Sequence, residues 1–435
     1  MAKSKVKSEV KSEAKSEAKS EAKSEAKPAA KSAADIIASY NAGREAERLA
    51  LKMTAMRANV FSFYRGTAHL FWQRVVEAHI DARAPAAWCS GDLHLENFGT
   101  YLADNGLAYF DVNDFDEAAK APCDWEMLRL LASIAIAAPA LNIGKPDAKT
   151  LMHSAATAYR DALRSGKARW IERRLAVGAI GELLDTLKSR DPTRLLNRRT
   201  KIVKGARRLD VPSDRMLAIS AVDRADLTKF AAALGKQFGR PDYFGFIDGA
   251  RRIAGTGSLG IARYVLLVQG DGSPDGNVLI DVKAAQPSSL AAWTTVSQPA
   301  WPSEAARIAG CQQRCQAVAP HLLDAVIFRG QPYVLKELQP TADRLDLARI
   351  AGKKGALGDV VQWMGRLAAW AQLRASGRDG TATADDLIAF AGGGAALVDR
   401  WIIAAQELAD LTRADYTIYC NAHDEAAARK TLPKQ

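Results

Sequence analysis

The sequence predicts an α+β protein with two lobes, a large helical lobe and a smaller antiparallel β lobe. Two observations favour this fold class. Apolar positions recur at helical spacing through most of residues 35–245 and again over residues 346–435. Between these segments, residues 246–345 hold short β-branched runs separated by glycine-rich turns, which is typical of an antiparallel sheet. The chain of 435 residues is long enough for this arrangement.

Residues 1–34 differ in composition from the rest, and we expect them to form a disordered tail. Lys-Ser-Glu-Ala repeats from Lys11 to Ala26, and this four-residue period would place like charges over one another on a helix. The segment also has few apolar side chains to bury. A weak electrostatic tether to nucleic acid or to a membrane is the alternative interpretation.

Composition narrows the classes of function. The formal net charge of +11 favours anionic partners, which include nucleotides, phosphorylated substrates and nucleic acid. No stretch is as long and apolar as a bilayer span requires, and the N-terminus lacks the apolar core of a secretory signal. The 5 cysteines have no C-x-x-C spacing, so neither a disulfide framework nor a zinc site is indicated. We therefore expect a cytoplasmic protein.

The individual elements follow from periodicity and turn signals. The first helix is expected to end in a turn at Phe61–Gly66, and Asp104-Asn105-Gly106 is expected to join two strands as a hairpin. From Trp125 to about residue 235 the pattern is overwhelmingly helical. We expect helices over residues 36–57, 67–80 and 303–318, and strands over residues 100–102, 107–112, 263–269, 278–284, 325–328 and 333–338.

Two loops of the helical lobe carry acidic and amide side chains at a spacing that suggests chemistry. Asp92 stands five residues before Asn97, and an acidic cluster, Asp114-Phe115-Asp116-Glu117, follows the predicted hairpin. In phosphoryl transfer one aspartate orients or deprotonates the attacking hydroxyl, while an asparagine and a later aspartate hold Mg²⁺ against the nucleotide phosphates. We therefore predict Asp92 as the catalytic base and Asn97 as a metal ligand. The alternative is that these side chains only hydrogen-bond within turns.

Other residues of these loops are further candidates. His94 lies inside the first loop, where it either takes part in catalysis or, as we favour, braces the loop. Asp111, Asp114 and Asp116 compete for the second metal position. Mg²⁺ binds few carboxylates and keeps waters and phosphate oxygens, so these three cannot all be direct ligands.

A glycine-rich segment in the β lobe predicts a phosphate-binding loop. Gly255, Gly257 and Gly260 form a G-x-G-x-x-G pattern, and the residues that follow are a predicted strand instead of a helix. A glycine loop between two strands is the arrangement in which protein kinases cover nucleotide phosphates. Because glycine has no side chain, its backbone can approach the phosphate oxygens closely. We include Ser258, inside this loop, among the nucleotide-binding candidates.

The strand over residues 278–284 carries the expected phosphate anchor, Lys283. Alternation places Val278, Ile280 and Val282 on one face, and Asp281 and Lys283 on the other. A lysine on the third strand that reaches the α- and β-phosphates is part of the kinase pattern V-A-I-K.

Kinases hold this lysine with a glutamate of the following helix. Glu304 is the weak candidate for that partner here, and Gln312 is the alternative.

Together these segments resemble a bacterial family of uncharacterised proteins, domain of unknown function 2252. The resemblance covers about residues 45–425 and is carried by Phe61–Gly66, Gly91–Gly99, Asp111–Glu117, Arg252–Gly260 and Arg307–Gln316. The family implies no settled activity. The acidic loops are separately similar to those of aminoglycoside and choline kinase-like phosphotransferases, which implies ATP and Mg²⁺ as ligands. That similarity favours Asp114 as the metal ligand, with Asp116 as a second ligand or a support.

The sequence departs from those phosphotransferases in two respects. Kinases place the glycine loop and lysine before the catalytic loop, whereas here both follow it. A protein-kinase-like fold would therefore be circularly permuted. In addition, Ser90 occupies a place where the phosphotransferases usually have histidine, and Gln372 one where the uncharacterised family often has it.

We therefore expect an ATP- and Mg²⁺-dependent phosphotransferase. The alternatives are a nucleotidyl (AMP) transferase with the same site, or a non-catalytic scaffold that binds nucleotides or nucleic acid. The basic stretch between Arg194 and Arg208 fits either a solvated helix face or a site for an anionic acceptor or nucleic acid. The residues identify neither the acceptor nor the oligomeric state.

Overall fold

The computed structural model describes residues 31–80, 83–188, 193–213, 215–253, 255, 257–339 and 344–431. Helices and strands are mixed, which confirms the α+β class. Most of the predicted tail lies outside the described residues. At its end Ser32 caps the first helix, so that ordered structure begins slightly earlier than predicted.

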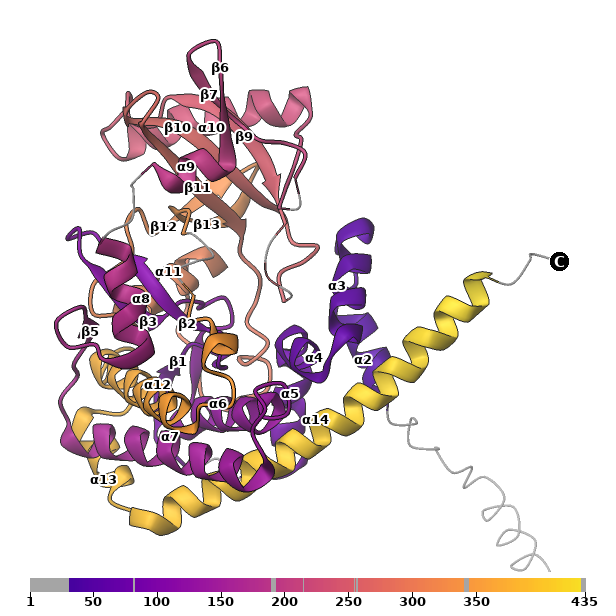
Figure 1. Cartoon of the computed structure of the whole chain (residues 1–435), viewed down its shortest axis with the longest axis vertical. Coiled ribbons are helices and arrows are strands. Elements are labelled where there is room, and N and C mark those ends of the chain that lie inside the picture. The colour runs from indigo at the N-terminus through magenta and orange to yellow at the C-terminus, as the bar shows by residue number, and fades with distance from the viewer. Residues whose placement is uncertain are drawn as a thin grey trace, which may run out of the picture.

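The lower part of the molecule in Figure 1 is mainly helical. Helix α6 runs through its centre and is buried on nearly all sides, because its sequence is apolar around most of its circumference. Its helices are α2 (Ala33–Tyr40), α3 (Ala46–Ala58), α4 (Val60–Gly66), α5 (Ala68–Glu77), α6 (Cys123–Ala137), α7 (Lys145–Ser165), α8 (Gly178–Lys188), α12 (Lys354–Ala375), α13 (Ala384–Ala391) and α14 (Gly394–Thr431).

Two small sheets in this helical part carry the acidic loops. One pairs β1 (Ala86–Cys89) with β4 (Ala119–Pro122), and the other contains β2 (Phe98–Leu102), β3 (Ala108–Val112) and β5 (Ile171–Glu172). Strands β2 and β3 form the predicted hairpin. The first acidic loop joins β1 to β2, and the second joins β3 to β4, so the two loops emerge side by side.

The upper part is a six-stranded antiparallel sheet in the order β12-β13-β11-β10-β9-β8. Helix α10 (Ala221–Gln237) packs on its outer face, where Leu227 and Phe230 meet Ile280 and Val282. The predicted alternation along β11 is therefore confirmed. The strands are β8 (Met216–Leu217), β9 (Phe246–Arg252), β10 (Arg263–Gly272), β11 (Gly276–Ala284), β12 (Asp324–Phe328) and β13 (Gln331–Glu337). Helix α11 (Glu304–Cys315) and the short 3₁₀ helix η2 (Leu347–Ile350) complete the described elements of the C-terminal half.

Two local predictions were wrong. Phe61–Gly66 lies in helix α4 because Asn59 caps it, its side-chain oxygen accepting from the Ser62 amide at 2.8 Å. The segment before residue 235 is not helical throughout. It includes α9 (Arg194–Arg199) and a hairpin of β6 (Thr200–Val203) and β7 (Ala206–Leu209).

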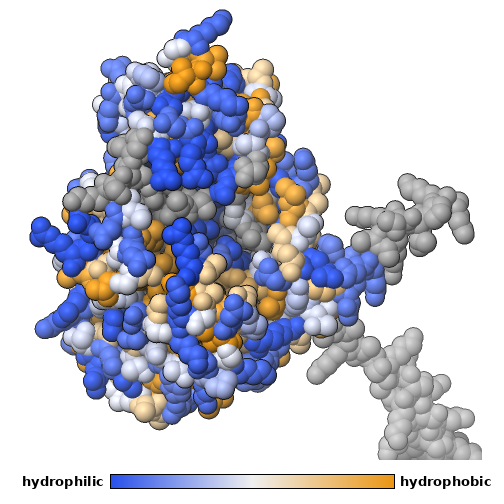
Figure 2. All heavy atoms as spheres, viewed as in Figure 1, coloured by the Kyte–Doolittle hydropathy of each residue, from blue (hydrophilic) through white to orange (hydrophobic). Residues whose placement is uncertain are grey.

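This hairpin carries much of the predicted basic stretch. Ile202 and Val203 are exposed near its turn, and Figure 2 shows an apolar patch at the same upper tip.

Among the described residues, no single helix has the length and apolar character to cross a membrane. Helices α13 and α14 satisfy that criterion only when taken together, as a pair bent by 87°.

Candidate active site

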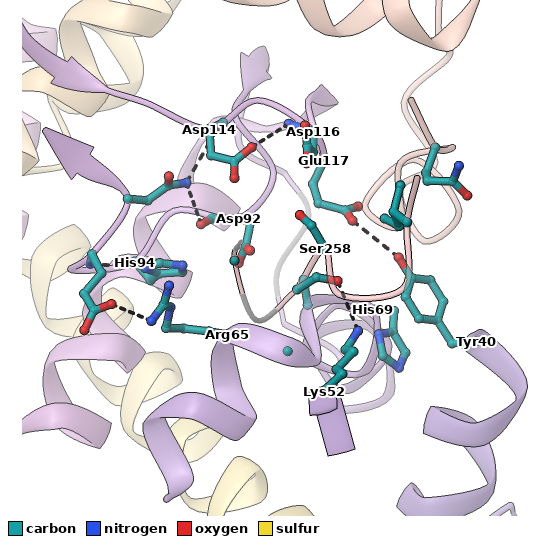
Figure 3. Close-up of a pocket in the computed structure, with 18 of the residues that line it drawn as sticks. Tyr40, Lys52, Arg65, His69, Asp92, His94, Asp114, Asp116, Glu117 and Ser258 are labelled. Atoms are coloured by element: carbon teal, nitrogen blue, oxygen red, sulfur yellow. Dashed lines mark hydrogen bonds and ion pairs between the residues drawn. The ribbon is translucent and has the colours of Figure 1, made fainter. Parts of the chain in front are cut away.

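A cleft lies where the acidic loops face the inner side of the six-stranded sheet (Figure 3). It has two connected halves that share part of their lining. The shared residues are Glu96, Asn97, Asp114, Asp116, Gly255, Ser258 and Arg344. The first half reaches toward α2, α3 and α5, and the second lies beneath β9, β10, β11 and β13.

Gly91 sets the path of the first acidic loop. Its φ is +80°, and a Cβ at this position would collide with the backbone oxygen of Glu117. Only glycine meets both demands without strain. The carbonyl oxygen of Gly91 accepts a hydrogen bond from Trp72 Nε1 at 3.1 Å, so helix α5 also fixes the loop.

Ser90 and Gln372, the two positions at which a histidine was expected, both contact Glu126 beneath this loop. Ser90 donates to Glu126 from both its amide and its hydroxyl, and Gln372 donates to Glu126 at 3.4 Å and to the Cys123 carbonyl at 2.9 Å. Burial raises the pKa of Glu126 to about 6. Serine and glutamine thus form a polar support in which no histidine is required.

Asp92 is held by a buried arginine from α6. Arg129 Nε donates to Asp92 Oδ1 at 2.7 Å, and the guanidinium lies over the rings of Tyr64 and Phe71 at 4.2 and 4.8 Å. Burial raises the pKa of Asp92 to about 6, although Arg129 opposes that rise. A carboxyl with a pKa close to neutrality suits a general base.

His94 is buried under the same loop. Its Nδ1 accepts from the Glu96 amide at 3.1 Å, and its ring stands edge-on to Phe61. Burial, together with the positive charges of Arg65 and Arg129, lowers the pKa of His94 well below its ordinary value. The neutral imidazole accepts a hydrogen bond from the backbone, which is the contact that a bracing role requires.

Asn97 and Asp114 lie together at the floor of the cleft. Asn97 Nδ2 donates to the carbonyl oxygens of Asp92 at 3.0 Å and Asp114 at 3.4 Å, which leaves its Oδ1 for another partner. Burial raises the pKa of Asp114, but the charges of Lys283 and Lys336 outweigh it and hold the pKa below its ordinary value. One amide oxygen and one ionised carboxylate are therefore available to a cation.

Lys283 reaches across the cleft and forms an ion pair with Asp116. No hydrogen bond or ion pair joins it to either expected partner. Glu304 pairs with Arg307, and Gln312 donates to Gln316. Arg307 in turn donates to the carbonyl oxygens of Asp116 and Ala118, so that helix α11 fixes the second acidic loop through an arginine.

Asp111 is the one metal candidate that the structure places elsewhere. It is buried on β3, where it accepts from Arg374 at 3.1 Å, and it does not line either half of the cleft. Burial raises the pKa of Asp111 to about 6 despite the neighbouring Arg374. Its contacts are those of a support between β3 and α12.

The glycine loop is anchored to the N-terminal helices by its carbonyl oxygens. Arg44 donates to those of Gly257 and Leu259 at 2.8 and 3.0 Å, and Lys52 donates to that of Gly257 at 3.2 Å. Gly255, Gly257 and Ser258 line the cleft, whereas Gly260, with φ +87°, packs against Arg44. Burial lowers the pKa of Lys52 to about 7.

The family model of an uncharacterised bacterial protein family, DUF2252, matches residues 44–422 of this chain. The chain belongs to that family. Comparisons with curated proteins and with solved structures gave no match.

Several residues of this DUF2252 site were missed by sequence reasoning. Arg129 and Arg307 gave no local signal, because their partners are loops distant in sequence. A signal did exist for the anchor of the glycine loop, since Arg44, Arg48 and Lys52 recur every four residues. Arg48 also donates to a carbonyl oxygen next to that loop, at Ile261.

The described residues contain no group of three or more His, Cys, Asp and Glu that could hold a metal ion by itself. Asn97 and Asp114 supply two ligating side chains. Such a site suits Mg²⁺ only when phosphate oxygens and waters complete its octahedral shell.

Proposed function

We propose that this protein is an ATP- and Mg²⁺-dependent phosphotransferase with two kinase-like lobes in permuted order. The observation that carries the proposal is the ion pair between Lys283 and Asp116. It brings Lys283, on the second strand after the glycine loop, against the acidic loop that contains Asp114. Both then line one cleft with Asp92 and Asn97. These are the parts that phosphoryl transfer needs, collected from two distant segments of chain.

The roles follow from the contacts of each side chain. Asn97 Oδ1 and the Asp114 carboxylate would hold Mg²⁺, which neutralises charge on the phosphates when bound. Lys283 would leave Asp116 for a phosphate oxygen. Gly255, Gly257 and Ser258 would cover the phosphates, with the loop held in place by Arg44 and Lys52.

Asp92 would act as the base. Its Oδ1 accepts from Arg129, so Oδ2 is the oxygen that can take the proton of an acceptor hydroxyl. As the hydroxyl oxygen bonds to the γ-phosphorus, the bond to the β–γ bridging oxygen breaks and ADP leaves. Arg129 fixes the carboxylate in one orientation during this step, which lowers the cost of alignment.

A thermal-shift measurement tests the proposal. A ligand that binds the folded state raises the melting temperature by mass action, and at one hundred times its Kd it adds about 2.7 kcal/mol of stability. We expect ATP to raise the Tm, and to raise it more when Mg²⁺ is present. Asp114→Ala should abolish the Mg²⁺-dependent part of this rise, whereas the matched variant Asp111→Asn should retain it. A wild-type protein whose Tm does not respond to ATP with Mg²⁺ would contradict the proposal.

A further inference from the structure

In the half of the cleft beneath the sheet, some of the basic side chains form no ion pair with a carboxylate. Its basic lining residues are Arg252, Arg263, Lys283, Lys336 and Arg344. Asp281 is shared by Arg252 and Arg263, and Asp116 pairs with Lys283. Among the described residues, no carboxylate forms an ion pair with Lys336 or Arg344.

The strand register creates this concentration of charge. Arg263 on β10 lies directly opposite Lys283 on β11, and Lys336 on β13 lies opposite Asp281. Residues directly opposite one another share a face of the sheet, so all four side chains point into the cleft. Neighbouring strands therefore present cations at adjacent positions.

Two of these cations are largely removed from water, whereas Lys336 is half-buried and Arg344 is exposed. The side chains of Arg263 and Lys283 are only 14% and 10% exposed. Burial lowers the pKa of Lys336, and Arg263 and Arg252 lower it further, while the charges of Asp114 and Asp281 oppose this shift. A half-buried cation without an ion-pair partner, such as Lys336, is partly desolvated, and a bound anion relieves that cost.

The same half offers little apolar surface to a nucleobase. Its described lining has only three larger apolar side chains, Phe115, Ile308 and Val334. The pattern V-A-I-K has a small alanine two residues before the lysine. Here that position is Asp281, which is buried in its ion pairs. A slot for a base is normally apolar, with a few polar groups that fix orientation.

In the other half of the cleft, the described lining offers no pair of separated aromatic rings between which a base could stack. The rings of Tyr40 and His69 are stacked on each other, with centroids 3.7 Å apart and planes within 9°. Their facing surfaces are already covered.

We infer that this site recognises its donor by the phosphate chain and not by the base. The inference rests on the proposed function and deepens it. The ligand class is a triphosphate, and it includes other nucleoside triphosphates and inorganic tripolyphosphate besides ATP. Lys336 and Arg344 supply positive charge that Asp114 attracts but that no described carboxylate holds in an ion pair.

Titration calorimetry with Mg²⁺ and four ligands tests this inference: ATP, GTP, UTP and tripolyphosphate. We expect Kd values that agree within about threefold, since less than 1 kcal/mol would then depend on the base. Lys336→Gln should weaken all four by about tenfold or more, because it removes a charge-assisted contact with phosphate. The matched control is Lys229→Gln, on the exposed side of α10, and it should change none of them.

The possible results distinguish a failure of this inference from a failure of the proposed function. Binding of ATP at least tenfold tighter than that of GTP, UTP and tripolyphosphate would overturn the inference and leave the phosphotransferase proposal intact. A Lys336→Gln protein that binds all four ligands with wild-type affinity would also overturn the inference and leave that proposal intact. If no triphosphate binds to the wild-type protein, the proposed function itself fails.

Discussion

In the proposed mechanism Asp92 is the catalytic base, and its environment predicts a pH dependence of turnover. Burial raises its pKa to about 6, and the ionised carboxylate is the form that accepts a proton. Turnover should therefore fall as pH drops through about 6 and level off above it. Asp92→Asn cannot accept the proton and should lose at least about a hundredfold in rate, while ATP still binds. ADP release and calorimetry measure the two effects, and full activity in this variant would remove Asp92 from the mechanism.

The buried guanidinium of Arg129, beside Asp92, gives a second prediction for a single residue. Arg129 opposes the rise in the pKa of Asp92, so Arg129→Met should raise that pKa further and move the midpoint of the pH–rate profile upward. Arg129→Lys keeps the charge and should leave the midpoint closer to that of the wild type. A purely structural arginine would lower the amplitude of the profile in both variants without moving its midpoint. A pH–rate profile of ADP release for each variant measures the difference.

At the scale of elements, the loop between β1 and β2 depends on one backbone conformation. Gly91→Ala adds a Cβ that meets the backbone of Glu117, in addition to the cost of a positive φ. Gly106→Ala is a matched control, because its φ is +76° and nothing lies within 4 Å of the added carbon. We expect about 1 kcal/mol of destabilisation at Gly106 from conformation alone and a larger loss at Gly91. Urea unfolding measures the loss of unfolding free energy in each variant. Equal losses would show that the loop moves to relieve the contact between the added Cβ and Glu117.

The elements also show what local sequence could and could not predict. Strands β10, β11 and β13 were predicted well because β-branched alternation and glycine turns are local signals. Phe61–Gly66 was misjudged because a single cap, Asn59, outweighed the glycine. Glu304 failed as the partner of Lys283 because a first-turn carboxylate reaches Arg307 on its own helix more easily than a distant strand.

At the scale of the whole molecule, chain order and spatial order differ. The glycine loop follows the acidic loops by more than a hundred residues, yet both line one cleft. Sequence motifs named most of that lining, since each motif is local. The side chains that hold it together come from α3, α6, α11 and the link between α2 and α3, and no local pattern could show which loops they would meet. Arg44, for example, contacts carbonyl oxygens more than two hundred positions away.

The ion pair between Lys283 and Asp116 spans the cleft, and it predicts opposite changes in ATP affinity for variants of its two residues. If Lys283 exchanges Asp116 for a phosphate oxygen, then Lys283→Met should weaken Mg²⁺-ATP binding by about tenfold or more. Asp116→Asn removes the competing carboxylate and should leave the affinity equal or improve it. If Asp116 is instead a metal ligand, both variants should bind ATP more weakly, and the Asp116→Asn loss should disappear when Mg²⁺ is omitted. Calorimetry of both variants with and without Mg²⁺ distinguishes these cases, because only a metal ligand links the effect of Asp116 to the cation.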